Sequence, residues 1–568
     1  MFTIAMLVQL GVFLSILTFV AYFLGEYMAK VFSGQRTWMS FILRPIENLC
    51  YRLFGVDENE EMNWKTYVVS FVVFNVIGIV VLFLLQLLQH LLPLNPQKLG
   101  SIRWDSALNT AVSFVTNTNW QSYVPESTMS YLTQMLGLAV QNFLSAAVGI
   151  AAVMAFIRGF IRKTTTDIGN FWVDTTRAVL YVLLPFAFVF SLVLVSQGVI
   201  QNFSPYVAAH TLEGNQQIIA QGPVASQLAI KMLGTNGGGF FNANSSHPYE
   251  NPTPMTDYLE ILGLLVITVA LPFAFGALLG KRKQGWAIFA VMMTLYLAGL
   301  SIALWSEFHG NPLLTNLGVE HGLNMEGKEV RFGPLASVVF AHSTTVTSCG
   351  AVNTMHDSFM PITGLILLFN MFIGEVVFGG VGVGLIGILH YAILAMFLVG
   401  LMIGRTPEIF GKKLEPYEMV MAVIALIVPS IVQLGFAAIA VSTTFGLSSL
   451  NNAGPHGLSE ILYAFGSAAG NNGSAFAGLN ANTVFYNLVL AFTILVGRFG
   501  TIIPALAIAG SLVKKKNVPE VAQFPTASPL FVFILIGVII IVGALTFFPV
   551  LVLGPFLEHL FISAGVTF

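Results

Sequence analysis

Residues 231–244 read KMLGTNGGGFFNAN, and this stretch interrupts a chain that is otherwise dominated by apolar, helix-forming sequence. Three consecutive glycines follow Thr235 and Asn236 in the middle of it. Glycine adopts backbone conformations that other residues avoid, so a glycine run ends a helix and exposes backbone carbonyl groups. Exposed carbonyls are tolerated at membrane depth only where they are buried in protein or line a water-filled path. The stretch therefore predicts a specialised site.

The composition is that of an integral membrane protein. Of the 568 residues, 56% are hydrophobic and 9% are charged, and the mean hydropathy is +0.81. Soluble domains carry about 25% charged residues. The net charge of −2 gives no basic excess that would indicate nucleic acid as a partner. Two cysteines, Cys50 and Cys349, are too few for a disulfide framework and are not spaced as metal ligands.

Ten apolar segments are long enough to span a bilayer, which takes about 20 residues. The seventh is too long for one straight helix and contains GEVVFGGVGVGLIG, so we expect it to be broken there. The first lacks a preceding basic region and a cleavage site, so we expect a retained helix. The segments cover residues 3–24, 66–92, 130–157, 173–199, 256–279, 285–305, 362–402, 418–444, 482–512 and 529–556.

Basic residues alternate between the two ends of these segments. Of the 24 lysines and arginines, 18 lie in or beside alternate connections. Short cytoplasmic loops are enriched in lysine and arginine. The alternation therefore predicts ten spans with both termini outside the cytoplasm.

The four long connections on the other side resemble one another. Each holds an apolar stretch of about 12–15 residues, too short to span, followed by small polar residues. If Thr118, Asn236, Cys349 and Asn472 are equivalent, the spacings are 118, 113 and 123 residues. We therefore predict an all-α polytopic protein with a single transmembrane domain (1–568) and four helix–pore-loop–helix repeats in pseudo-fourfold arrangement. The expected parts are an N-terminal helix (1–30), repeats at 64–159, 170–280, 284–403 and 416–514, and a C-terminal helix (528–568).

Four re-entrant loops from one side are typical of a cation selectivity filter. Rings of carbonyl oxygens replace the hydration shell of a monovalent ion, and half-helix C-termini direct partial negative charge at it. The four filter stretches themselves contain no acidic side chain, which argues against a divalent cation. In the second loop we expect Gly237 to line the ion path. Gly238 and Gly239 are expected to let the chain turn outwards, with Phe240 and Phe241 packing the loop.

Three charged residues within apolar sequence each allow two interpretations. Lys231 is either an electrostatic barrier at the pore or a lysine that snorkels or is structurally paired, and the second is favoured. Glu375 and Arg498 either form a structural ion pair, or Glu375 and the adjacent glycines form a movable gate below the filter. His342, the best candidate for a chemically active residue in a loop, is expected to be a pore-helix residue with a satisfied hydrogen bond.

Nine motifs, in order along almost the whole chain, resemble the KdpA family, the potassium-binding subunits of the bacterial potassium-transporting Kdp ATPase. They are EMNWKTYV, NTAVSFVTNTNWQSY, MLGTNGGGFFNANSSHP, NMEGKEVRFG, SCGAVNTMHDS, IGEVVFGGVG, LMIGRTPE, NNGSAFAG and LVGRFG. The resemblance implies a subunit of the bacterial inner membrane that works with KdpB, KdpC and KdpF. Potassium would enter through the filter and pass along an intramembrane tunnel to KdpB, where ATP and Mg²⁺ bind.

The resemblance also implies roles for individual residues. Gln121 matches a position linked to ion affinity and selectivity. Glu375, Arg405 and Arg498 match charged positions near the path or its cytoplasmic gate, although Arg405 also fits the general basic pattern of cytoplasmic loops. The fourth loop has Gly470 where the family suggests asparagine. The implied filter residues are Asn117, Thr118, Asn119, Thr235, Asn236, Gly237, Ser348, Cys349, Gly350, Asn471, Asn472 and Gly473.

Two alternatives to a pump subunit remain. One is a stand-alone potassium channel or symporter of the Trk, Ktr or HKT type, which shares the four-repeat pattern. The other is an enzyme with an intramembrane site, which has little support because no histidine, cysteine or carboxylate cluster has ligand or nucleophile spacing. The chain also lacks a phosphate loop and an Asp-Lys-Thr-Gly phosphorylation motif. We therefore expect no ATP hydrolysis by this chain alone and no organic cofactor.

Overall fold

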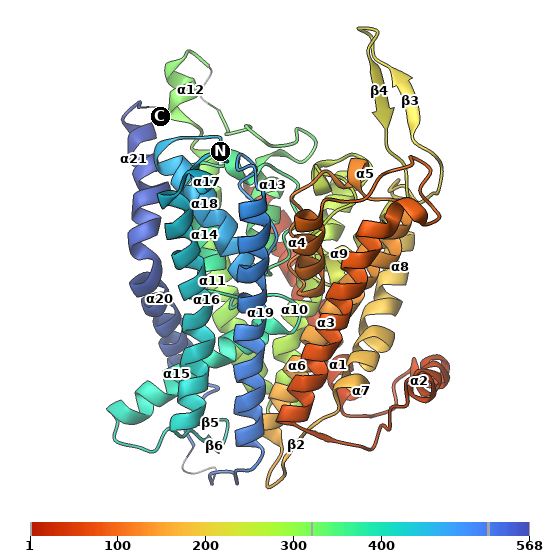
Figure 1. Ribbon diagram of the computed structural model, residues 1–568. Helices are drawn as coiled ribbons and strands as arrows, with labels where there is room; N and C mark the ends of the chain where they lie inside the picture. Colours follow the sequence, from red (N-terminus) through yellow and green to blue (C-terminus); the bar gives the residue numbers. More distant parts are fainter. Residues whose placement is uncertain (1–2, 320–321, 520–522, 567–568) are drawn as a thin grey trace.

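The computed structural model describes residues 3–319, 322–519 and 523–566. It is a bundle of long helices that run between two ends, with small two-stranded sheets at those ends (Figure 1). Ten helical stretches of the described residues are long and apolar enough to cross a membrane. They are α1 (Ile4–Phe32), α3 with η1 (Trp64–Leu88, Gln89–Leu91), η2 with α6 (Thr133–Ala139, Val140–Ile161), α7, η3 and α8 (Phe171–Arg177, Ala178–Leu183, Leu184–Ser196), α10 (Pro254–Leu278), α11 with α12 (Arg282–Phe308, Pro312–Asn316), α15 (Val383–Met402), α16 (Pro416–Ser442), α19 (Val484–Leu512), and α20, η7 and α21 (Pro529–Leu551, Val552–Phe556, Leu557–Ser563).

The ten predicted spans are confirmed, with differences mainly at their ends. Helix α1 continues to Phe32 instead of ending near residue 24, and the last stretch continues to Ser563. The overlong seventh segment is broken as expected. Helix α14 (Pro361–Phe372) ends before a non-helical stretch, and α15 begins again at Val383. Within the break, Gly374, Gly379 and Gly382 have positive φ.

Four shorter helices lie between the spans and are buried along most of their length. They are too short to cross a bilayer, and each comes from one of the four long connections. Three of them contact the second long helix of their own repeat: α4 contacts α6, α9 contacts α10, and α18 contacts α19. The predicted half-helices are therefore present. Their bounds are α4 Trp104–Val115, α9 Val224–Leu233, α13 Gly333–Val346 and α18 Gly454–Ala469.

The two ends of the bundle differ in charge and in shape. Both chain termini lie at the upper end in Figure 1, where the hairpin of β3 (Val207–His210) and β4 (Gln216–Ile219) projects. The lower end carries the basic connections together with the other two sheets. Those sheets pair β1 (Met62–Asn63) with β2 (Asp167–Gly169), and β5 (Glu408–Ile409) with β6 (Lys412–Lys413).

Several short elements complete the fold. Helix α2 (Ser40–Phe54) lies beside the lower end of the bundle (Figure 1), where it contacts α7 and η3. It is amphipathic: Glu47 and Tyr51 are buried, while Phe41 and Phe54 are exposed, as in a helix lying in a membrane interface. The others are α5 (Pro125–Thr128), η4 (Asn244–Ser246), η5 (His356–Ser358) and α17 (Thr444–Leu447).

Close helix packing depends on small residues, as is usual in membranes. Helix α1 lies along α10, and a side chain at Gly25 would overlap the backbone of Ala270 and Ala274. Gly159 of α6 similarly faces the backbone of Ala509 in α19. This packing holds the outer helices around the four short ones.

Candidate ion-binding site

The four half-helices end in the same backbone conformation. After each C-cap residue, the first and third residues of a three-residue loop have positive φ, and the middle residue does not. Left-handed backbone is uncommon outside glycine and is strained for threonine, so its fourfold recurrence marks one structural device. The pairs are Asn117 and Asn119, Thr235 and Gly237, Ser348 and Gly350, and Asn471 and Gly473.

A hydrogen bond of the same register closes each helix. The N–H of the middle residue donates to the carbonyl oxygen five residues earlier, the 6→1 bond of a Schellman cap. The first loop residue then takes the left-handed cap position. This confirms the predicted equivalence of the four loops. The bonds are Thr118 to Ser113 (2.9 Å), Asn236 to Lys231 (2.9 Å), Cys349 to Thr344 (3.0 Å) and Asn472 to Ser467 (2.8 Å).

The loops meet one another in a closed ring. A Cβ added to Gly237 would overlap the carbonyl oxygen of Cys349 in the third loop. The same substitution at Gly350 would overlap the carbonyl oxygen of Asn472 in the fourth loop. At Gly473 it would overlap that of Thr118 in the first loop. Each glycine is therefore required because a neighbouring carbonyl lies where its side chain would be.

Side-chain amides close the remaining contact and stiffen the ring. Asn117 Nδ2 donates to the carbonyl of Thr235 at 3.0 Å, joining loops one and two. Asn236 Nδ2 donates to Asn117 Oδ1 at 2.6 Å. Asn471 Nδ2 donates to Thr118 Oγ1 at 2.9 Å, joining loops four and one. All of these side chains are buried, so the loops are held by hydrogen bonds rather than by lipid.

The middle carbonyls of the loops remain free. Among the described residues, none donates a hydrogen bond to the carbonyl oxygen of Thr118, Asn236, Cys349 or Asn472. An unpaired buried carbonyl is costly unless another partner supplies the missing interaction. Four such oxygens at the C-terminal, negative ends of four helices suit a dehydrated monovalent cation.

The structure thus brings all twelve predicted filter residues together. Gly470 is the C-cap of α18, the place that Gly234 holds in α9, and so lies just before the loop triple. Gln121 lies beside the second loop: its Oε1 accepts from the N–H of Gly239 at 3.0 Å, and its Nε2 donates to Tyr123 Oη at 3.2 Å.

The backbone of Gly238 and Gly239 is not unusual. Neither has positive φ, so neither turns the chain by an unusual conformation. Glycine is needed at both positions because neighbouring atoms occupy the space that a side chain would take. A Cβ on Gly238 would overlap Phe114 and Asn119, and one on Gly239 would crowd Glu250.

Two polar residues of the half-helices are structurally paired. Lys231 Nζ lies 2.7 Å from Glu250 Oε2, and both side chains are buried. This confirms the favoured interpretation of a paired lysine. His342 Nε2 lies 2.9 Å from the carbonyl oxygen of Tyr296, and its Nδ1 lies 3.2 Å from Asn370 Nδ2. His342 is therefore satisfied by hydrogen bonds, as expected.

The broken seventh segment lies beneath the ring. Thr235 Oγ1 accepts from the N–H of Val381 in this break at 3.0 Å. Glu375 Oε2 accepts from the N–H of Gly380 at 2.7 Å, and Arg498 Nη2 donates to the carbonyl oxygen of Ser145 at 3.1 Å. Within the described residues, no ion pair shorter than 4.0 Å joins Glu375 to Arg498. The direct ion pair considered for these two residues is therefore absent.

A cavity of about 310 Å³ opens beside this break. Its walls include Glu375, His390 and Gly470, so it extends from the end of the fourth half-helix to the broken segment. Arg405 is exposed and follows the end of α15, and it does not line this cavity. The walls also include Ile427 and Ile431 of α16, which are exposed, so the cavity opens towards the outer surface of the bundle.

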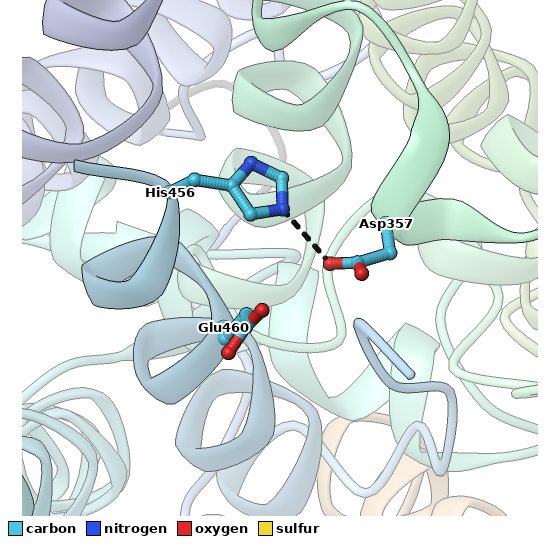
Figure 2. Close-up of side chains that lie close together, drawn as sticks. All are labelled: Asp357, His456 and Glu460. Atoms are coloured by element: carbon cyan, nitrogen blue, oxygen red, sulfur yellow. Dashed lines mark hydrogen bonds and ion pairs between the residues drawn. The ribbon is translucent and has the colours of Figure 1, made fainter. Parts of the chain in front are cut away.

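A second cluster of ionisable groups lies outside the ring (Figure 2). Asp357, His456 and Glu460 offer ligand atoms within 4.8 Å of one another. However, both ring nitrogens of His456 are occupied, Nε2 by Asp357 at 3.0 Å and Nδ1 by Glu558 at 2.8 Å. Burial opposes protonation, but the hydrogen bonds to these two carboxylates outweigh it and raise the pKa of His456 to about 10. The cluster is thus an imidazolium bridging carboxylates, which accounts for its geometry without a metal.

Sequence reasoning missed Asn244 and Glu250, which support the second loop. Asn244 Nδ2 donates to the carbonyl oxygen of Gly237 at 2.7 Å. Glu250 Oε1 accepts from the N–H groups of Phe240 and Phe241. The available signal was a carboxylate and an amide in a loop that follows a buried lysine, but spacing alone does not pair them.

The fold and the ring define the class: a polytopic helical membrane protein with four re-entrant loops around one axis, the architecture of ion channels and transporters. The family model of KdpA, described as potassium-transporting ATPase A subunit, matches residues 11–560. The chain belongs to this family.

Curated relatives cover nearly the whole chain. The chain is 53% identical to the potassium-transporting ATPase potassium-binding subunit of Acidobacterium capsulatum, over 99% of each protein. It is 55% identical to the protein of the same description from Bradyrhizobium diazoefficiens, over 96% of each. Among solved structures, it is similar in fold to the potassium transporter TrkH from Vibrio parahaemolyticus, with a TM-score of 0.51 and 16% identity, over 87% of this chain and 96% of that one.

Proposed function

We propose that this chain is the potassium-binding and translocating subunit of an ATP-driven, high-affinity potassium uptake pump of the bacterial inner membrane. Its relatives from Acidobacterium capsulatum and Bradyrhizobium diazoefficiens, both described as potassium-binding subunits of potassium-transporting ATPases, support this proposal. The observation that carries it is the fourfold loop with a free middle carbonyl. The proposed filter consists of Asn117–Asn119, Thr235–Gly237, Ser348–Gly350 and Asn471–Gly473.

Potassium fits this ring better than a divalent cation does. The filter triples offer neutral carbonyl, amide and hydroxyl oxygens and no carboxylate. Divalent ions such as Ca²⁺ and Mg²⁺ take carboxylate ligands or keep much of their hydration shell. A monovalent ion is dehydrated at lower cost, and carbonyls at the negative ends of helices compensate for its lost water. Gln121 supports the second loop from outside the ring and so tunes affinity and selectivity.

Below the filter, the ion passes into the cavity of about 310 Å³ beside the broken segment. Glu375 lines this cavity, and its bond to Gly380 holds the backbone of the break. We propose that the break is the gate and that the cavity begins the tunnel to the ATPase subunit. Arg498 supports the upper part of this path, and Arg405 acts at its cytoplasmic end.

The energy for potassium transport comes from a partner subunit. ATP and Mg²⁺ bind to KdpB, which is phosphorylated, and KdpC and KdpF complete the complex. The basic lower end faces the cytoplasm, because lysine and arginine are enriched there. Both termini and the filter loops then face outwards, where potassium is captured.

Purification from the native membrane tests this function. A P-type ATPase that copurifies with the chain and is stimulated by potassium supports the proposal. Selective potassium conduction by the purified chain alone, in liposomes without ATP, indicates instead a channel or symporter of the Trk type. In that case the pump assignment is wrong, even though the filter assignment stands.

A further inference from the structure

We propose that Lys231 is a positioning residue of the filter, which acts through Asn244 on the carbonyl group of Gly237. The inference rests on the proposed function, because it concerns how one quarter of that filter is held. Lys231 lies in the last turn of α9, and its side chain is 1% exposed. An ammonium group this deeply buried needs partners for its charge and its protons.

All three partners of Lys231 come from the segment that follows the second loop. Its Nζ lies 2.7 Å from Glu250 Oε2 and 2.6 Å from Asn244 Oδ1. Ser245 Oγ is the third acceptor, at 3.3 Å. An ammonium group has three N–H donors and no acceptor, so the three acceptors match all the donors of Lys231. Because its charge is paired with Glu250, Lys231 is a scaffold rather than a barrier to cations.

The contact with Asn244 fixes the direction of an amide. Because Asn244 Oδ1 accepts from Lys231, its Nδ2 must point the other way, where it donates to the carbonyl oxygen of Gly237 at 2.7 Å. Asn244 Oδ1 also accepts from the N–H of Val352, just beyond the third loop, at 3.3 Å. Without the ammonium group, a flipped amide would direct its oxygen at the Gly237 carbonyl. The N–H of Ser245 also donates to Asn244 Oδ1, at 2.9 Å. Lys231 therefore acts together with the N–H groups of Ser245 and Val352 to hold the orientation in which Asn244 donates to this carbonyl.

This arrangement makes the second loop different from its equivalents. The carbonyl of Gly237 accepts a side-chain hydrogen bond, whereas no described residue donates to the carbonyls of Gly350 and Gly473. The partner carboxylate also holds the exit of the second loop, since Glu250 Oε1 accepts from the N–H of Phe240 at 2.7 Å. Lys231 and Glu250 together fix where the Gly237 carbonyl stands, and so the shape of the ring at the adjacent Asn236.

The chain offers a matched control in the next repeat. Lys328 Nζ lies 2.9 Å from Glu307 Oε2, and the two side chains are 1% and 0% exposed. Glu307 also accepts from Asn324 Nδ2 and from the N–H of Met360. None of these partners belongs to a filter triple. Lys328→Met therefore removes an equally buried charge without loosening a filter carbonyl.

The test measures the potassium dependence of ATPase activity in the assembled complex, with rubidium as a second ion. Lys231→Met and Asn244→Ala should each raise the half-maximal potassium concentration about tenfold, the effect of losing one hydrogen bond. The maximal rate should change much less. The double variant should be no worse than the poorer single variant, because both substitutions remove the same restraint. Lys328→Met should leave the potassium dependence unchanged.

Two outcomes overturn the inference: unchanged potassium dependence in assembled Lys231→Met, or fully additive effects in the double variant. If Lys231→Met does not assemble, the double variant Lys231→Met/Glu250→Gln, which removes both charges, replaces it. The single variant Asn244→Ala then still tests whether the bond to the Gly237 carbonyl affects potassium affinity. Gly350→Ala separates this inference from the proposed function. If Gly350→Ala weakens potassium affinity and the Lys231 and Asn244 variants do not, only the positioning role is wrong. If none of them does, the filter assignment itself is wrong.

Discussion

Replacing Gly350 with alanine tests the geometry of the ring. Gly350 has a φ of +86°, and an added Cβ would overlap the carbonyl oxygen of Asn472. Left-handed backbone costs a non-glycine residue about 1–2 kcal/mol, which lowers stability. Ordinary van der Waals separation also requires the Asn472 carbonyl to move by about 1 Å. Because this oxygen is one of the proposed ion ligands, we expect the loss of about 2 kcal/mol of ion binding, or a potassium affinity weakened roughly 30-fold.

The assay is a potassium titration of ATPase activity in the purified complex, together with a measurement of complex abundance. Gly473→Ala should behave like Gly350→Ala, because its Cβ would overlap the Thr118 carbonyl in the same way. Gly435→Ala is the control, since Gly435 lies in α16 with no atom within 4 Å of its added Cβ. If Gly350→Ala assembles and titrates like Gly435→Ala, the ring does not bind the ion.

Three further substitutions probe the surroundings of the ring. Gln121→Arg removes the bonds to Gly239 and adds a cation, so potassium affinity should fall by tenfold or more and rubidium discrimination should weaken; an unchanged titration excludes Gln121 from this role. Glu375→Gln should slow potassium transport at normal abundance and leave filter affinity unchanged, as flux assays in proteoliposomes can check; wild-type flux contradicts the gate. His456→Gln should destabilise the protein most at low pH. The pKa of His456 rises from 6.5 to about 10 on folding, so its contribution, at most about 5 kcal/mol, is complete below pH 6.5 and lost as pH rises through 10. The unfolding temperatures of the wild type and of His456→Gln should therefore converge above pH 10. A difference that stays constant with pH contradicts the charged state assigned to His456.

Much of the architecture follows from local sequence. Apolar length predicts the ten spans, and the spacing of Thr118, Asn236, Cys349 and Asn472 predicts the four equivalent loops. These features depend on local sequence. The length of a spanning helix is set by the bilayer thickness, and the end of a half-helix is set by the residues at that end. The Schellman cap that ends all four half-helices is a local motif, although Thr235 and Ser348 hold its left-handed position where glycine or asparagine is usual.

Other features depend on tertiary contacts that spacing does not contain. Gly238 is glycine because Phe114 and Asn119 fill the space beside it. Asn244 reaches back seven residues to hold Gly237, and Glu375 bonds to the backbone of the break rather than to Arg498. In each case the packing of the loops determines which residue is the partner. Sequence spacing alone is compatible with several different pairings.

The most direct measurement is the position of a heavy potassium analogue in the assembled complex. Rubidium or thallium should give density on the axis of the four loops, surrounded by the carbonyl oxygens of Thr118, Asn236, Cys349 and Asn472. Gly350→Ala should weaken this density. Density at Asp357, His456 and Glu460, with none between the four carbonyls, would contradict the proposed site.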